Sequence, residues 1–287
     1  METMRKVTSG IVLSLLLGVL LGIPQLCGME VRAAETVTAD VSWYTKEEGK
    51  KTYTIKTDSE LLGLRNIVNG YDGVAADDLS GITIVLGNDI DMNQAVIETP
   101  IGSTARTPFS GTFDGGDHSI SNFKVSPKSS VATGLFGNIK NAAISNLKLK
   151  DATVAYEQTS YNSNGTAGLA GAAAASTIKN CSYEGNVRGT YYVGALIGKG
   201  TGLSITDCTV KGTVTVKNNY SGGIAACLTQ GSISGCDVQA DITSTNGYVG
   251  GIAGQLTTNS CTIENCSFNG KLSGASNVGG IAGSCGT

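Results

Sequence analysis

The sequence is poor in histidine, proline and charge. It holds one histidine, one tryptophan and four prolines in 287 residues, and only 15% of its residues are charged. With His118 as its single histidine, the chain lacks the His-Glu-x-x-His motif of zinc proteases. Its basic residues form no stripe and its formal net charge is −3, so nucleic-acid binding has no electrostatic support.

The sequence is instead rich in glycine and small polar residues. The chain has 40 glycines, and 40% of its residues are hydrophobic. An apolar share of this size with few prolines is not a composition of disordered chains. It favours a folded protein with many tight turns.

A four-residue unit occurs six times from residue 134 onward. Its copies begin at residues 134, 168, 195, 223, 251 and 280, and they read GLFG, GLAG, ALIG, GIAA, GIAG and GIAG. The spacings between their first residues are 34, 27, 28, 28 and 29 positions. A period of about 20 to 50 residues indicates a solenoid, a propeller or another repeat array.

A second signature keeps phase with the first and predicts strands. The pattern Ile-x-Asn-Cys, or a close variant, follows each of the first five units. After Cys208, apolar residues and glycine alternate with Thr209, Lys211, Thr213 and Thr215, which is the period of a β-strand. A repeat of about 28 residues accommodates three short strands, whereas a propeller blade needs roughly 40 to 50 residues. We therefore predict an all-β fold, a right-handed parallel β-helix.

The first 33 residues have the pattern of a secretory signal peptide. Arg5 and Lys6 precede an apolar run over residues 11–23, and small residues before the end predict cleavage after Ala33. Cys27 follows Leu26, where a lipoprotein signal needs a small residue, so plain cleavage is favoured. We expect an extracellular or cell-surface protein without a membrane span after cleavage.

Residues 34–80 are predicted to form an N-terminal cap, and residues 81–287 the β-helix. The cap comprises a strand over residues 52–55 and an amphipathic helix that begins with a capping box at residues 57–60 and ends at Gly70. The helix is expected to cover the open end of the first coil. Residues 81–86 are predicted as the first solenoid strand, and residues 157–164 as an insertion that loops outward.

The last repeat is incomplete. It starts at residue 279 and has no Ile-x-Asn-Cys strand before Thr287. We expect the chain to be the beginning of a longer protein, or to associate with itself or a partner through an open C-terminal edge.

The cysteines divide into a ladder and a remainder. One position of the repeat holds a large apolar residue or cysteine in successive coils, which predicts a structural core ladder: Phe123, Leu147, Cys181, Cys208, Cys236 and Cys266. Parallel Cβ vectors in such a column suit neither a disulfide nor a zinc site. Cys227, Cys261 and Cys285 lie off this ladder, and a disulfide between two of them is left open.

Other candidate sites have plain structural explanations. His118 lies near Asp114 and Asp117, but it immediately precedes a strand. The carboxylates Asp77, Asp78, Asp207, Asp237 and Asp241 do not form the motifs of pectin hydrolases. Three tyrosines recur every 28 residues: Tyr192, Tyr220 and Tyr248. This spacing predicts either an exposed stripe that stacks on sugar rings or a ladder of rings packed on one another. We assign no catalytic, cofactor-binding or metal-binding residue.

From about residue 55 onward the chain resembles a known family. The repeats, with Asp89-Ile90-Asp91 and Pro100-Ile101-Gly102 upstream, resemble GLUG-motif surface proteins of Firmicutes. Such repeats also occur in N-terminal regions of IgA-specific metallopeptidases. The resemblance implies a non-enzymatic surface module for adhesion to host or bacterial glycans or proteins. An accessory region of a larger metallopeptidase or glycan-active enzyme, or a structural stalk, is the alternative.

Overall fold

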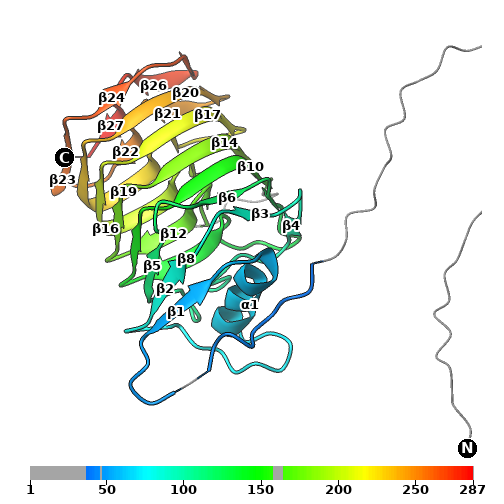
Figure 1. The fold of residues 1–287 in the computed structure, drawn as a ribbon. Helices are drawn as coiled ribbons and strands as arrows, with labels where there is room; N and C mark the ends of the chain where they lie inside the picture. The colour runs from blue at the N-terminus through cyan, green and yellow to red at the C-terminus, as the bar shows by residue number, and fades with distance from the viewer. Residues whose placement is uncertain (1–36, 46, 158–163, 287) are drawn as a thin grey trace, which may run out of the picture. The chain divides into compact units, whose positions relative to one another are not determined.

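The computed structural model describes residues 37–45, 47–157 and 164–286. The predicted leader and most of the predicted insertion at residues 157–164 lie outside these ranges. Residues 34–287 form one compact unit, and the described part of it winds into a parallel β-solenoid with a single helix near the N-terminal end of that part (Figure 1). The predicted all-β parallel solenoid is confirmed.

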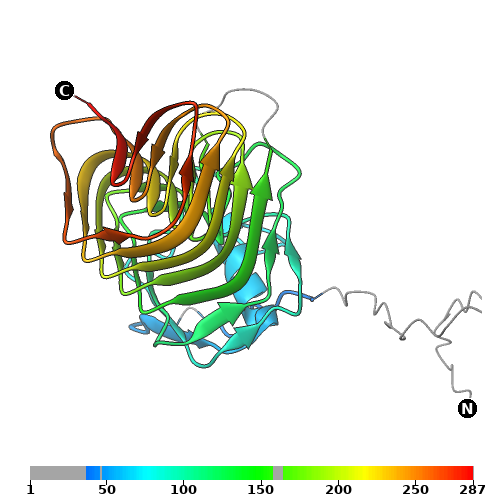
Figure 2. The same ribbon diagram turned by 90° about the horizontal axis from the view of Figure 1, so that it is seen from above.

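Three parallel sheets form the faces of the solenoid; the first coils contribute to sheets 1 and 2, and strands of sheet 3 begin at Thr166 (Figure 2). Sheet 1 comprises β1 (Thr52–Ile55), β2 (Thr83–Leu86), β5 (Thr112–Asp114), β8 (Phe136–Lys140), β9 (Ala143–Ser145), β12 (Ala170–Ala174), β13 (Thr177–Lys179), β16 (Ile197–Thr206), β19 (Ala225–Ser234), β22 (Ala253–Leu256), β23 (Cys261–Glu264) and β27 (Ala282–Cys285). Sheet 2 comprises β3 (Ile90–Asp91), β4 (Val96–Ile97), β6 (Ser119–Ser121), β7 (Lys124–Val125), β10 (Lys148–Tyr156), β14 (Ser182–Gly189), β17 (Thr209–Val216), β20 (Asp237–Ser244), β24 (Ser267–Phe268) and β25 (Leu272–Ser273). Sheet 3 comprises β11 (Thr166–Ala167), β15 (Val193–Gly194), β18 (Ser221–Gly222), β21 (Gly247–Gly250) and β26 (Ser276–Gly279).

The N-terminal helix α1 (Asp58–Asn69) closes one end of the stack. Thr57 and Glu60 form the predicted capping box, and Gly70 ends the helix with a φ of 72°. Leu61, Leu64 and Val68 are each at most 1% exposed. Figure 1 shows α1 beside β1 and β2, at the end of the solenoid opposite the C-terminal coil. The helix therefore covers apolar surface that the first coil would otherwise expose to water.

The boundary expected at residue 80 is too late. β1 pairs with β2 residue for residue, from Thr52 with Thr83 to Ile55 with Leu86. The strand assigned to the cap is thus the first strand of sheet 1, and β2 is the second. Tyr53 and Ile55 are buried while their neighbours are exposed, which is the same inward and outward alternation as in the later coils.

A left-handed turn carries the chain from sheet 1 to sheet 2. The residue in this turn has positive φ: 54° at Asn146, 51° at Asn180, 56° at Asp207, 64° at Gly235 and 52° at Asn265. Asn122, with a φ of 55°, lies instead between β6 and β7 within sheet 2. Asparagine, aspartate and glycine tolerate this conformation better than other residues. Side-chain amides also link the coils: Asn180 Nδ2 donates to Asn146 Oδ1 at 2.9 Å. This explains why these residue types recur in the signature.

The four-residue unit forms a sharp bend between sheet 3 and sheet 1. Gly223 and Ile224 connect β18 to β19, and the Ile224 side chain is fully buried. The two strands approach so closely that a Cβ on Gly222 would lie 2.1 Å from the carbonyl oxygen of Ala225. A side chain there requires the backbone to move, so the glycine permits the close approach.

The predicted core ladder lies inside the solenoid at the start of sheet 2. Leu147, Cys181, Cys208 and Cys236 are at most 3% exposed, whereas Cys266 in the last coil is half-buried. The assignment of Phe123 to this ladder is wrong: Phe123 is buried, but β6 pairs with residues 148–150 and β7 with residues 153–154, so Phe123 lies beside Ala152 and not beside Leu147. All seven described cysteines are free thiols, so no pair among Cys227, Cys261 and Cys285 forms a disulfide. Thiol hydrogen bonds with Cys181 and Cys236, together with burial, raise the pKa of Cys208 well above its ordinary value.

Thiol labelling should separate these cysteines by position. In the folded protein at pH 8, we expect a thiol-specific reagent to modify the exposed Cys285 within minutes. Cys181, Cys208 and Cys236 should react only after unfolding in urea, because burial in the core blocks access of the reagent. Mass spectrometry of the labelled peptides provides the measurement. Equal labelling rates for Cys208 and Cys285 in the folded state would contradict the closed core.

The coil nearest the C-terminus is less covered than the others. Among the described strands, β24 and β25 pair only with β20, and β26 and β27 only with β21 and β22. Val278 is 45% exposed and Ile281 is 44% exposed, although equivalent residues in earlier coils are buried. Apolar side chains thus reach solvent at this end of the described chain.

Candidate ligand-binding surfaces

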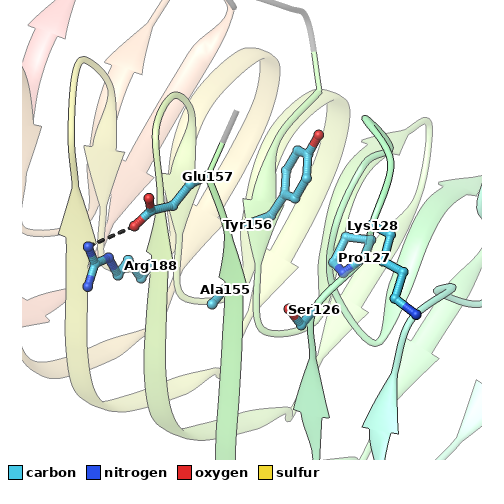
Figure 3. Close-up of a pocket in the computed structure, with 7 residues that line it drawn as sticks. All are labelled: Ser126, Pro127, Lys128, Ala155, Tyr156, Glu157 and Arg188. Atoms are coloured by element: carbon cyan, nitrogen blue, oxygen red, sulfur yellow. Dashed lines mark ion pairs between the residues drawn. The ribbon is translucent and has the colours of Figure 1, made fainter. Parts of the chain in front are cut away.

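An open pocket of about 470 Å³ lies where strands of sheet 2 end (Figure 3). β7, β10 and β14 run in parallel toward this corner, so residues at their carboxyl ends meet there. The volume lies within the range of about 300–1,000 Å³ that is typical of small-molecule sites. Its lining combines aromatic, apolar and charged residues: Ser126, Pro127, Lys128, Ala155, Tyr156, Glu157 and Arg188. We call it the corner pocket.

Ion pairs connect the strands at the corner pocket. Arg188 Nη2 lies 2.7 Å from Glu157 Oε1, and the Lys217 ammonium group bonds to the other oxygen of the same carboxylate. Lys128 Nζ lies 2.7 Å from Glu98 Oε1. The hydrogen bond from Lys217, with the nearby charge of Arg188, lowers the pKa of Glu157, so this carboxylate is ionised at neutral pH.

The side chains in the pocket have distinct positions. In Figure 3, Glu157 turns toward Arg188 on one side of the Tyr156 ring, while Pro127 and Lys128 lie on the other side. Arg188 is 55% exposed and Lys128 is 80% exposed, so both cations are accessible to a ligand. The aromatic ring therefore stands between two positively charged groups.

The three tyrosines of the repeat form a stacked ladder. The rings of Tyr192 and Tyr220 lie 4.6 Å apart at 3°, and those of Tyr220 and Tyr248 lie 4.9 Å apart at 19°. Lys199 Nζ lies 4.6 Å from the centroid of the Tyr192 ring. Both faces of the Tyr220 ring are covered by its neighbours, so Tyr220 offers a ligand only its edge and hydroxyl group. The geometry is that of a ladder packed on itself.

These tyrosines also adopt an unfavourable backbone conformation. Their φ angles are 51°, 70° and 62° for Tyr192, Tyr220 and Tyr248, and Asn277 follows at the same position with 52°. The left-handed region costs a non-glycine residue about 1–2 kcal/mol. An aromatic pair contributes about 0.5–1.5 kcal/mol beyond its buried area, which offsets much of that cost.

A second, smaller groove lies on the outer face of sheet 1. It has a volume of about 290 Å³, and small side chains such as Ala172 and Ala174 lie beside Pro108. Lys140 and Lys199 also line it. The groove lacks the aromatic side chain and the carboxylate that the corner pocket provides.

The remaining candidate residues take part in local structure. His118 Nδ1 lies 3.6 Å from Asp89 Oδ1, and that oxygen also accepts the backbone N–H of Ser119. Asp77 accepts hydrogen bonds from the Tyr44 hydroxyl and the Leu79 backbone, and Asp78 accepts one from the Ser80 backbone. These carboxylates are occupied by turns and packing, so they resemble structural residues more than a catalytic pair.

Two of the other acidic residues bond to the next coil. Asp237 accepts hydrogen bonds from Gln239 and Ser267, and Asp241 accepts one from the Lys271 backbone. Within the described ranges, no group of three His, Cys, Asp or Glu side chains is arranged to hold a metal ion. The same part of the chain contains no helix with the length and hydropathy of a membrane span.

The repeat geometry agrees with a family comparison. The model of the GLUG motif matches residues 189–215 and 245–273. Each matched segment contains one four-residue bend and the polar turn before sheet 2. The chain carries GLUG repeats. The resemblance drawn from the residues alone is confirmed, and the coil between the two matches has strands in the same three sheets.

Two known proteins are similar to parts of this chain, one in sequence and one in fold. Halomucin of Haloquadratum walsbyi (strain DSM 16790 / HBSQ001) is 29% identical over 153 residues, which cover 44% of this chain and 2% of halomucin. A crystal structure from Bacteroides ovatus, of a protein provisionally named an immunoglobulin A1 protease, matches with a TM-score of 0.51. That match is 19% identical and covers 82% of this chain and 83% of the other. At this identity the likeness shows the fold alone.

The corner pocket was not predicted from the sequence. Its signal was nonetheless present, because Glu157, Arg188 and Lys217 lie 31 and 29 positions apart. Residues about one repeat apart become neighbours in adjacent coils, and opposite charges at that spacing predict an ion pair. The irregular spacing between the units at 134 and 168 hid this relation.

Proposed function

We propose that this GLUG solenoid is a non-enzymatic module of a secreted or cell-surface protein that binds glycans or proteins of a host or neighbouring cell. The corner pocket carries the proposal, because it places an aromatic ring between accessible cations on a rigid scaffold. Sites that combine apolar or aromatic surface with a few placed polar groups are typical ligand-binding sites.

The scaffold around the pocket supports a binding role. β14, β17 and β20 pair without a register shift over eight residues each. Val210, Val214 and Val216 face the core, and the threonines between them are exposed. Buried side chains thus fix the strands, while the exposed side chains are free to contact a partner.

Two other roles are favoured by separate observations. The match to halomucin covers only 2% of that protein, which is consistent with this segment serving as an accessory region or stalk within a longer chain. The Bacteroides ovatus structure has a similar fold and belongs to a protein named as a protease. This observation favours the alternative that the solenoid is an accessory region of a surface protease. An accessory region or stalk needs no ligand in the corner pocket, so binding measurements distinguish these roles.

A glycan array tests the proposed function directly. We expect the purified chain to bind a subset of glycans, and the double variant Tyr156→Ala, Arg188→Thr to lose at least about tenfold in affinity. Threonine is chosen because Thr215 occupies the position of Arg188 in the next coil. Lys211→Gln is the control, since it removes one positive charge from sheet 2 outside the pocket. Absence of glycan binding, or equal binding by the double variant, would argue for an accessory region or stalk.

A further inference from the structure

We propose that the corner pocket binds a sugar residue that bears a carboxylate, with the carboxylate held by Arg188 and the sugar ring packed on Tyr156. This inference rests on the proposed glycan-binding function and names its ligand class.

The pocket has a positive balance on a negative chain. Its ion pairs involve three cations, Lys128, Arg188 and Lys217, and two anions, Glu98 and Glu157. The whole chain has a formal net charge of −3. A local excess of positive charge favours an anionic ligand over a neutral one, and a planar guanidinium group matches a carboxylate through two parallel hydrogen bonds.

The apolar surface of the pocket suits a sugar ring. Tyr156 and Pro127 both line the cavity, and Figure 3 shows the tyrosine ring rising between the two cations. Aromatic side chains provide a large apolar face with little conformational freedom to lose. A pyranose ring has C–H groups on its faces and hydroxyl groups at its rim, so it can pack on Tyr156 while its carboxylate points to Arg188. A bare phosphate has no ring that could pack on Tyr156.

Glu157 occupies the place that a ligand carboxylate would take. Its side chain is bonded to both Arg188 and Lys217 and remains 42% exposed. An acidic ligand must therefore compete with Glu157 for Arg188. It follows that removal of the Glu157 charge should strengthen binding of an acidic ligand, while removal of the Arg188 charge should weaken it. A neutral ligand that used Glu157 as a hydrogen-bond acceptor would show the opposite response to the first change.

Isothermal titration calorimetry with two matched oligosaccharides tests the inference. The probes are a β-1,4-linked glucuronic acid tetrasaccharide and cellotetraose, which differ only in the oxidation of C6 to a carboxylate. We expect the acidic tetrasaccharide to bind at least about tenfold more tightly than cellotetraose. Its affinity should fall as NaCl is raised from about 0.05 to about 0.5 M, because salt screens exposed charges.

Three variants test how individual charged side chains affect the affinity for the acidic tetrasaccharide. Arg188→Thr should weaken binding of the acidic tetrasaccharide at least about tenfold. Glu157→Gln should strengthen it about two- to fivefold, the scale of an exposed ion pair. Lys211→Gln, which makes the same change in net charge as Arg188→Thr but lies outside the pocket, should leave affinity unchanged.

The outcomes separate the ligand class from the proposed function. Equal affinity for the two tetrasaccharides, or weaker acidic binding in Glu157→Gln, overturns the acidic-sugar inference and leaves glycan binding standing. Binding of neither probe, together with an empty glycan array, overturns both. A loss of the same size in Lys211→Gln would show that overall charge, not this pocket, governs binding, and it too overturns the inference.

Discussion

Replacing Gly223 with valine should destabilise the protein by about 3 kcal/mol or more, at the upper end of over-packing effects. Gly223 begins the bend between sheet 3 and sheet 1. A Cβ at this position would lie 2.3 Å from the carbonyl oxygen of Gly251 and 2.5 Å from Cγ1 of Val238. The first contact is with backbone of the next coil, which cannot move without disturbing the stack. The change in the urea midpoint, followed by circular dichroism, measures the effect.

Gly280→Val is the matched control. Gly280 holds the same place in the repeat unit two copies later, but a Cβ there would meet no atom within 4 Å. The same substitution should therefore cost less than about 1 kcal/mol. If both variants lose equal stability, the glycine requirement is a property of the local backbone and not of the contact between coils.

Replacing Leu64 with aspartate should cost about 4 kcal/mol or more, since it removes a buried apolar side chain and buries an unpaired charge. Leu64 is fully buried in α1, the helix that covers the first coil. Chemical unfolding at pH 7, with wild type alongside, measures the loss. Leu64→Met is the control, because it conserves apolar volume and should cost less than about 1.5 kcal/mol.

The cost of Leu64→Asp should depend on pH in a defined direction. Burial raises the pKa of an aspartate in the folded state above its unfolded value of about 3.9. The folded variant then binds more protons than the unfolded chain between these two pKa values, so its stability falls as pH rises through that window. The difference from wild type should thus be smaller at pH 4 than at pH 7. A difference independent of pH would mean that residue 64 reaches solvent and that α1 does not close the first coil.

The sequence by itself determined the architecture, because the same pattern of turn residues and alternating strand residues repeats in successive coils. Positive φ at the Asn, Asp or Gly of each turn and alternating burial after each ladder position are local properties. Stacking equivalent residues at equal spacing then follows from the period alone. For the same reason α1 could be bounded from its capping box and from Gly70. These features depend on neighbours within a few residues.

Only the tertiary structure decided where β1 belongs and where a ligand could bind. Thr52–Ile55 joins sheet 1 by pairing with a strand 31 positions away, and no local signal distinguishes that pairing from a free-standing cap. The ion pairs at the corner pocket form because three neighbouring strands of sheet 2 end there, which brings together Glu157, Arg188 and Lys217. The irregular repeat spacing before β14 conceals their alignment in the sequence. Stacking of the Tyr192, Tyr220 and Tyr248 rings likewise depended on side-chain rotamers in three successive coils. Contacts between coils depend on side-chain packing between residues that are far apart in the sequence. The sequence pattern specifies this packing only in part.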